Sequence, residues 1–182
     1  AALERVAAMI LGAQNPLIMI GAGGSRPRLV EPLSDFVRRM RIPFFNTQMG
    51  KGAVTGGSNL YLGTAALSER DYIHDAIEQS DLIIAIGHDT VEKPPFLMGS
   101  KLGGLKVVHI GYSSAKVEEV YHPDAEVIGD VGATCAALAE KLGGRLETSI
   151  RILELRQRIL AKLNEGAEEP RFPPTPQRLV RD

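Results

Sequence analysis

The fold of this chain is decided by the stretch Leu17-Ile18-Met19-Ile20-Gly21-Ala22-Gly23-Gly24-Ser25, in which a short apolar run leads directly into a glycine-rich loop. Consecutive apolar residues bounded by turn signals are typical of a strand that is buried on both faces of a parallel sheet. Residues 29–40 follow with apolar side chains at helical spacing. Strand, glycine loop and helix in this order predict the first unit of an α/β fold.

The same alternation of apolar runs and helical patterns continues along the chain. Further strands are predicted at residues 43–45, 82–86, 106–110 and 126–128, and further helices at residues 3–11, 68–79 and 131–142. Residues 46–63 are rich in Gly, Asn, Ser and Thr and are predicted to form a loop. Helices that alternate with buried strands predict a Rossmann-like, doubly wound α/β fold, with a mainly parallel sheet of about five to six strands and helices on both faces.

Two segments differ in composition. Residues 1–145 are predicted to form one domain, and residues 146–182 a linker helix and connector. The second segment combines a charged amphipathic helix with a stretch rich in Pro and Glu, and it ends where Thr175 and Pro176 suit the cap and the first position of another helix. Since the chain also opens inside a helix without Met, we expect it to be the central part of a longer protein, with the connector leading to a C-terminal domain.

The composition restricts the function classes. The net charge is −1 and no basic stripe is present, which argues against a nucleic-acid partner. No apolar run has the roughly 18–20 residues that cross a bilayer, so no membrane association is predicted. A single cysteine, Cys135, allows neither an internal disulfide nor a Cys-rich zinc site, and its apolar helical surroundings predict a buried core residue. A cytoplasmic location is expected from this cysteine usage.

Glycines follow four of the predicted strands and mark a candidate ligand site. In open parallel sheets, ligands bind at the carboxyl ends of the strands, where glycine lets the backbone approach a phosphate. The candidate cofactor-binding residues at this edge are Gly21, Ala22, Gly23, Gly24, Ser25, Thr47, Gln48, Gly87, His88, Asp89 and Gly111. The alternative is that the glycines only end strands and form tight turns, and the sequence leaves both interpretations open.

The glycine loop differs from the dinucleotide fingerprint. Arg26 stands where the third glycine of G-x-G-x-x-G belongs, and the second strand runs into Asn46-Thr47 in place of an acidic residue. These differences disfavour an NAD dehydrogenase. No order of Ser, His and Asp, or of Cys and His, indicates a catalytic triad, and no spacing of side chains is typical of metal ligands. No catalytic or metal-binding residue is therefore predicted. His109, inside a strand, is expected to be a hydrogen-bonded core residue, and His74 and His122 to lie at the surface.

Several segments together resemble the central domain of thiamine-diphosphate-dependent enzymes such as acetolactate synthase. They cover residues 16–23, 50–54, 61–63, 80–87, 127–131 and 173–177. The resemblance implies that flanking domains bind thiamine diphosphate and Mg²⁺, that the full enzyme is a homo-oligomer, and that it condenses 2-oxo acids such as pyruvate with loss of CO2. The isolated central domain is then expected to be inactive. The family's magnesium motif is Gly-Asp-Gly, whereas Val131 follows Asp130 here, so Asp130 is predicted to be a helix N-cap.

The residues after the strand at 82–86 bear on flavin binding. FAD-binding members of the family usually carry Gly-Ala-Arg there, whereas this chain has Gly87-His88-Asp89-Thr90-Val91-Glu92. This segment is similar to the Gly-Tyr-Asp-Pro-Val-Glu of the catabolic, flavin-independent acetolactate synthases. Asp89 places a negative charge where the arginine would meet phosphate. FAD and ADP are the candidate ligands of the crevice, and FAD binding is predicted to be weak or absent.

Three alternatives stay open at this stage. Other thiamine-diphosphate decarboxylases and carboligases share the same central domain. A stand-alone nucleotide-binding or electron-transfer module would also have this fold. A sirtuin-type NAD-dependent deacylase has a Gly-Ala-Gly-x-Ser loop like residues 21–25, but that class needs four zinc-binding cysteines, and this chain has one.

Overall fold

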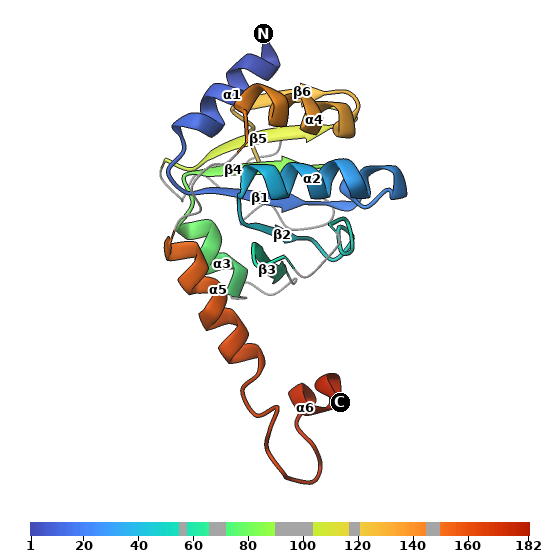
Figure 1. The fold of residues 1–182 in the computed structure, drawn as a ribbon, viewed down its shortest axis with the longest axis vertical. Coiled ribbons are helices and arrows are strands. Elements are labelled where there is room, and N and C mark those ends of the chain that lie inside the picture. Colours follow the sequence, from blue (N-terminus) through green and yellow to red (C-terminus); the bar gives the residue numbers. More distant parts are fainter. Residues whose placement is uncertain (55–57, 66–71, 90–103, 117–120, 145–149) are drawn as a thin grey trace.

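A computed structural model describes residues 1–54, 58–65, 72–89, 104–116, 121–144 and 150–182. These residues contain a parallel sheet of six strands in the order β3-β2-β1-β4-β5-β6 (Figure 1). The strands are β1 (Pro16–Ile20), β2 (Phe44–Asn46), β3 (Tyr61–Thr64), β4 (Leu82–Ile86), β5 (Lys106–Gly111) and β6 (Ala125–Ile128). Because the chain builds β2 and β3 on one side of β1 and then crosses to β4 on the other, the strand order reverses between β1 and β4.

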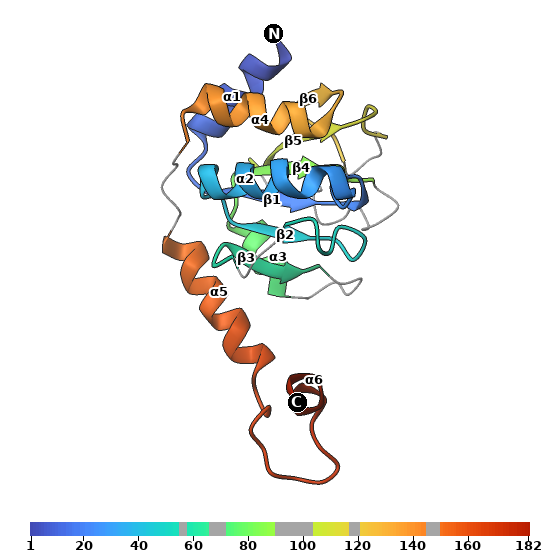
Figure 2. The same cartoon turned by 45° about the vertical axis from the view of Figure 1, so that its right-hand side comes forward.

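Helices cover both faces of this sheet (Figures 1 and 2). They are α1 (Ala2–Gly12), α2 (Val30–Met40), α3 (Tyr72–Glu78), α4 (Val131–Leu142), α5 (Ile150–Leu163) and α6 (Pro176–Arg181), with two 3-10 turns, η1 (Ala22–Gly24) and η2 (Pro27–Leu29). Helices α1, α2 and α4 pack on one face, and α3 and α5 on the other. The predicted Rossmann-like α/β class is confirmed.

The two cores follow from the alternation of side chains along the strands. In β1, Ile18 and Ile20 face α1, α2 and α4, whereas Leu17 and Met19 face α3 and α5. All four side chains are at most 1% exposed. A strand buried on both faces has no polar position, which is why the sequence of β1 is an unbroken apolar run.

The strand β3 was not predicted, because it lies in the segment that the sequence analysis took to be a loop. It is a four-residue strand at the edge of the described sheet, where it pairs with β2, and the register of this pair shifts between Phe44 and Phe45. Of its side chains, only Leu62 is fully buried, and Gly63 has a φ of +133°. A short, half-exposed edge strand with glycine produces no apolar run. The first residues of the predicted helix at 68–79 lie outside the described residues.

Helix α5 contributes to the domain core before the chain turns away from it. Leu155 and Ile159 are 1% and 3% exposed and belong to the core on the α3 side. The Arg156 Nε donates to the Tyr61 carbonyl at 3.0 Å, which ties α5 to β3. Beyond α5 the chain forms an open hook that ends in α6 (Figure 2). Thr175 caps α6 as predicted, its hydroxyl accepting from the Arg178 amide at 3.1 Å. The boundary at residue 145 stays a prediction.

Candidate functional site

The glycine loop after β1 meets the turn after β4 at the point where the strand order reverses. The Gly23 amide donates to the Gly87 carbonyl at 2.8 Å. A Cβ atom on Gly23 would lie 2.9 Å from the Gly87 Cα, and one on Gly87 would lie 2.4 Å from the Gly24 amide nitrogen. Gly87 also has a φ of +61°, in the left-handed region. These glycines therefore allow two backbone segments to pack directly against each other.

The amides of this loop are already hydrogen-bonded to protein carbonyls. The Gly21 amide donates to the Ile86 carbonyl at 2.9 Å, the Gly24 amide to the Gly21 carbonyl at 2.9 Å, and the Ser25 amide to the Ala22 carbonyl at 3.1 Å. The loop forms η1 and does not open the α-helix, because α2 begins only at Val30. These hydrogen bonds support the structural role, ending strands and forming tight turns, that the sequence analysis gave the glycines as an alternative.

The other predicted residues of this edge have different environments. Thr47 is 1% exposed, and its hydroxyl accepts from the Gly50 amide at 3.1 Å while its own amide donates to the Ile20 carbonyl at 2.9 Å. Gln48 is exposed. The Gly111 carbonyl accepts from the Gly129 amide at 2.9 Å, which joins the ends of β5 and β6. Thr47 and Gly111 therefore hold strand ends in place.

His88 lines a small pocket of about 40 Å³ beside the ends of β4 and β5. Its side chain is only 6% exposed, and neither ring nitrogen has a hydrogen-bond partner within the described part of the chain. Burial lowers the pKa of His88 to about 4, and the nearby His109 adds to the effect. Its ring meets Tyr121 edge-on, with the ring centroids 5.5 Å apart. His88 is therefore a neutral, buried imidazole at physiological pH.

His109 lies in the same pocket but is fully hydrogen-bonded. Its Nε2 is 3.1 Å from the Ser113 carbonyl, which can only accept, so Nε2 carries the proton and donates. Its Nδ1 then accepts from the Tyr121 hydroxyl, at 2.9 Å. Burial raises the pKa of Tyr121, so the phenol keeps its proton. The prediction of a hydrogen-bonded core histidine is confirmed.

Asp89 extends from this pocket into solvent. Its carboxylate is half-exposed and lies 4.0 Å from the Lys116 ammonium. The sequence analysis treated Asp89 as a negative charge without a partner, and no spacing rule relates it to Lys116. The ion pair between them reduces the negative potential at this strand end, but only modestly, because both groups are solvated.

A cluster that the sequence analysis did not predict lies on the other side of the same edge. The guanidinium carbons of Arg26 and Arg28 lie 4.3 and 5.6 Å from the centroid of the Tyr112 ring. Arg28 also reaches the Tyr112 hydroxyl at 3.5 Å and the Asp130 carboxylate at 3.8 Å. Arg26 was noted only as a departure from the glycine fingerprint. We call these residues, Arg26, Arg28 and Tyr112, the arginine–tyrosine cluster.

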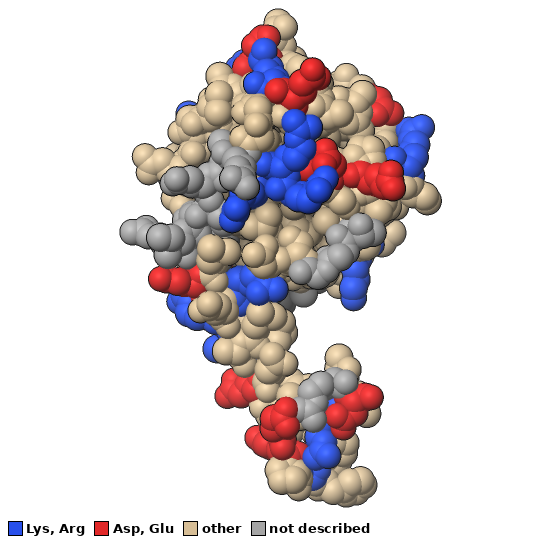
Figure 3. All heavy atoms as spheres, viewed as in Figure 1, with Lys and Arg blue, Asp and Glu red and all other residues tan. Residues whose placement is uncertain are grey.

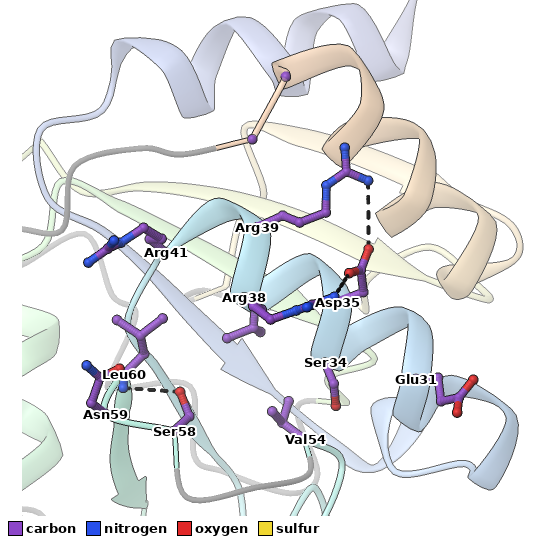
Figure 4. A pocket seen from close by; sticks show the side chains of 13 residues that line it. Glu31, Ser34, Asp35, Arg38, Arg39, Arg41, Val54, Ser58, Asn59 and Leu60 are labelled. Atoms are coloured by element: carbon purple, nitrogen blue, oxygen red, sulfur yellow. Dashed lines mark hydrogen bonds and ion pairs between the residues drawn. The ribbon is translucent and has the colours of Figure 1, made fainter.

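A groove of about 1240 Å³ runs along the outer side of α2 (Figure 4). Asp35 lies between Arg38 and Arg39 and pairs with both, and the Arg39 guanidinium also donates to the Ala139 carbonyl of α4 at 3.3 Å. Figure 3 shows basic and acidic side chains next to each other on this face of the molecule. The basic charge of the groove is therefore partly neutralised within α2 itself.

The other residues that the sequence analysis singled out are Asp130, Cys135, His74 and His122. The Asp130 carboxylate accepts from the Ala133 amide at 2.9 Å, which confirms it as the N-cap of α4. Cys135 is fully buried, and burial raises the pKa of its thiol to about 12, as expected of a core residue. His122 is exposed as predicted, whereas His74 is half-buried.

Among the described residues, no group of three or more His, Cys, Asp or Glu side chains could hold a metal ion, and no helix could cross a membrane.

The strand order, with its reversal between β1 and β4, defines this chain as a Rossmann-like α/β domain. Comparison with known proteins gives the family. Residues 3–138 match the family described as thiamine pyrophosphate enzyme, central domain, and the chain belongs to this family. The resemblance predicted from the sequence is thus confirmed, and the deacylase alternative is set aside.

Individual relatives are acetolactate synthases. The catabolic acetolactate synthase of Raoultella terrigena is 32% identical over 99% of this chain and 33% of that enzyme. The acetolactate synthase of Bacillus subtilis is 24% identical over 92% of the chain and 29% of its own length. That of Mycobacterium avium is 28% identical over 75% of the chain and 22% of its own length. The chain therefore spans about a third, or less, of the relatives that it matches.

Proposed function

We propose that this chain is the central domain of a longer thiamine-diphosphate-dependent carboligase, which condenses 2-oxo acids such as pyruvate, with loss of CO2, to acetolactate. The observation that supports this most is the 32% identity to a catabolic acetolactate synthase over 99% of the chain, together with the family match. Another decarboxylase or carboligase with the same central domain is the second candidate.

The chemistry of such an enzyme belongs to its flanking domains. Thiamine diphosphate, when bound there, would supply a nucleophilic ring carbon for the reaction with 2-oxo acids. The described residues of this chain do not fit that cofactor's magnesium ion: Asp130 caps α4, and the Asn164 amide donates to the Leu160 carbonyl at 2.9 Å. Here the domain serves as a rigid scaffold, whose two packed cores hold its ends, and hence its neighbours, in place.

Flavin is not required for this proposed activity. The glycine-loop amides are used within the protein, and Asp89 stands at the strand end where FAD-binding relatives usually carry arginine. Both features support weak or absent FAD binding, with FAD and ADP as the candidate ligands of the crevice. We also propose that the full-length protein is a cytoplasmic homo-oligomer, in which the outer domains supply most of the contacts between subunits.

The test compares the full-length protein with the 182-residue chain. With pyruvate, thiamine diphosphate and Mg²⁺, the full-length protein should form acetolactate at the same rate with and without FAD. The isolated chain should form none, and it should sediment as a monomer or a weakly associating species at micromolar concentration. A full-length protein that only decarboxylates pyruvate would favour the second candidate, and a gene that encodes this domain alone would refute the proposal.

A further inference from the structure

The groove along the outer side of α2 reaches the edge of the sheet where the strands begin. Arg41 follows α2 and leads towards β2, and residues 58–60 lead into β3. Gly143 and Gly144, after α4, complete this end of the groove. Because the strands are parallel, this end is opposite to the glycine loop. It is therefore a surface separate from the candidate cofactor site.

This end of the groove carries an excess of positive charge. Arg38, Arg39 and Arg41 lie there, whereas Glu31 lies at the start of α2 (Figure 4). Asp35 pairs with both Arg38 and Arg39, so two guanidinium groups share one carboxylate. The side chain of Arg38 is 79% exposed, so its charge is accessible to a partner. We call Arg38, Arg39 and Arg41 the arginine triplet.

Arg41 has a backbone conformation that disfavours arginine. It is the C-cap of α2 with a φ of +54°, and among the described residues it is the one non-glycine residue with a positive φ. Glycine takes this position at a helix end without a steric penalty, so arginine lowers the stability of the fold. An unfavourable backbone conformation at an exposed residue indicates that its side chain has a role other than folding.

The size and the lining of the groove fit a segment of polypeptide. Its volume of about 1240 Å³ exceeds the roughly 300–1,000 Å³ of small-molecule pockets. Along α2 it spans about 16 Å, the length of about five residues of extended chain. Val37 and Leu60 are 1% and 6% exposed and leave little apolar surface for a partner. Ser34, Ser58 and Asn59 line the groove with hydroxyl and amide groups, so an occupant is bound by charge and hydrogen bonds.

We propose that the groove along α2 binds an extended acidic segment of a partner protein, with carboxylates of that segment at the arginine triplet. Guanidinium groups bind carboxylates through charge-assisted hydrogen bonds, often two at a time. This inference goes beyond the proposed function and does not depend on it. The groove and the crevice lie at opposite edges of the sheet, so the failure of one proposal leaves the other standing.

The test measures the binding of a short fluorescein-labelled peptide that alternates glutamate and serine, by fluorescence anisotropy at low ionic strength. The 182-residue chain and the full-length protein should both bind it saturably. A peptide that alternates lysine and serine should bind at least about tenfold more weakly. Arg38→Gln combined with Arg41→Gln should weaken binding of the acidic peptide at least about tenfold, because two charge-assisted contacts are lost.

Arg26→Gln is the matched control for the double variant. Arg26 is an exposed arginine of the arginine–tyrosine cluster, at the other edge of the sheet. Its loss removes one positive charge without touching the arginine triplet. The dissociation constant of the acidic peptide should therefore stay within about twofold of that of the unmodified chain.

Two further variants move binding in opposite directions. Asp35→Asn removes the carboxylate that Arg38 and Arg39 share, so the acidic peptide should bind a few times more tightly. Arg41→Gly should weaken binding about threefold, as expected for one exposed ion pair. The same variant should raise the thermal midpoint, because glycine suits the left-handed backbone. Weaker binding by a more stable variant separates a lost contact from a lost fold.

Four results would overturn the proposal. The first two are an absence of saturable binding to the unmodified chain and equal binding of the acidic and basic peptides. The third is an equal loss in Arg26→Gln and in the double variant, which would show a general attraction of the surface for anions. The fourth is binding to the 182-residue chain but not to the full-length protein, which would show that a flanking domain covers the groove.

Discussion

Two tyrosines near the end of β5 have opposite environments. Tyr112 packs at the margin of the core under α2 and α4, and its ring face carries two exposed arginines. Tyr121 is buried in the core on the α3 side, where its hydroxyl donates to His109 and its ring meets His88. One side of the carboxyl edge therefore exposes two arginines around a tyrosine, whereas on the other side the rings of His88 and Tyr121 are buried.

This difference matters for the stability of the fold. Exposed cations contribute little to folding, because water solvates them as well as the protein does. A buried imidazole without hydrogen-bond partners affects the stability of the fold, because its protonation is opposed by the surrounding core. We expect substitutions at Arg26 to leave the free energy of unfolding almost unchanged and those at His88 or Tyr121 to alter it.

The largest effect is expected at Gly87, which lies between the two sides. In Gly87→Ala the new Cβ would meet the Gly24 amide at 2.4 Å, on a backbone with a φ of +61°. The combined overlap and strain should lower the free energy of unfolding by roughly 2–5 kcal/mol, as measured by urea denaturation.

Gly143→Ala is the matched control for Gly87→Ala. Gly143 has a φ of +69°, and nothing lies within 4 Å of an added Cβ. This variant should cost only about 1 kcal/mol, from the backbone alone. Equal losses in the two variants would show that the contact between Gly23 and Gly87 is unimportant.

The next effect concerns the loss of stability in acid that His88 causes. Its pKa is lowered to about 4 in the folded chain, so between pH 6.5 and 4 the unfolded chain binds a proton that the folded chain does not. The free energy of unfolding should therefore fall by roughly 3 kcal/mol as the pH drops through this window. Above pH 7 the contribution is constant.

His88→Leu tests this pH dependence directly. The variant cannot bind that proton, so the difference in stability between it and the unmodified chain should vary between pH 7.5 and 4. At pH 7.5 it should be at least as stable, because it removes two buried nitrogens that have no hydrogen-bond partner among the described residues. Parallel stability curves for the two proteins would show that His88 is hydrated and titrates normally.

A smaller effect is expected at the hydroxyl of Tyr121. Tyr121→Phe leaves the buried Nδ1 of His109 without its donor and should cost roughly 1–3 kcal/mol. Tyr112→Phe is the control on the exposed side, because its hydroxyl only reaches Arg28 at 3.5 Å, and the expected cost is below about 0.5 kcal/mol. Thermal unfolding of both variants gives the comparison, and a larger loss in Tyr112→Phe would reverse it.

The smallest effect lies on the exposed side, at the cap of α4. Asp130→Ala removes the acceptor for the Ala133 amide and should cost about 1 kcal/mol in denaturant unfolding. Asp130→Asn should be nearly as stable as the unmodified chain, since asparagine caps helices as well as aspartate does. If both variants lost the same stability, the pairing with Arg28, and not the cap, would account for it.

The local sequence pattern by itself determined several strands, the fold class and the environments of several single residues. Buried strands at β1 and β4 follow from unbroken apolar runs, and β5 from an apolar run that only His109 interrupts. The class of the sheet follows from the alternation of these strands with helices. Asp130, Cys135 and His109 were predicted correctly, because a cap, a small apolar residue in a helix and a histidine inside a strand are all properties of neighbouring positions. The family resemblance also rests on the order of short motifs along the chain.

The contacts between residues that lie far apart in the sequence were decided only by the tertiary structure. The packing of Gly23 on Gly87 depends on β1 and β4 being adjacent, and the stacking of Arg26 on Tyr112 depends on the chain crossing the end of β4. Strand β3 is defined by its pairing with β2, and Leu155 and Ile159 of α5 are buried because the helix lies against α3 and β3. Residue spacing sets which way a side chain points from its own element, but which element it then meets is set by the order of the strands in the sheet.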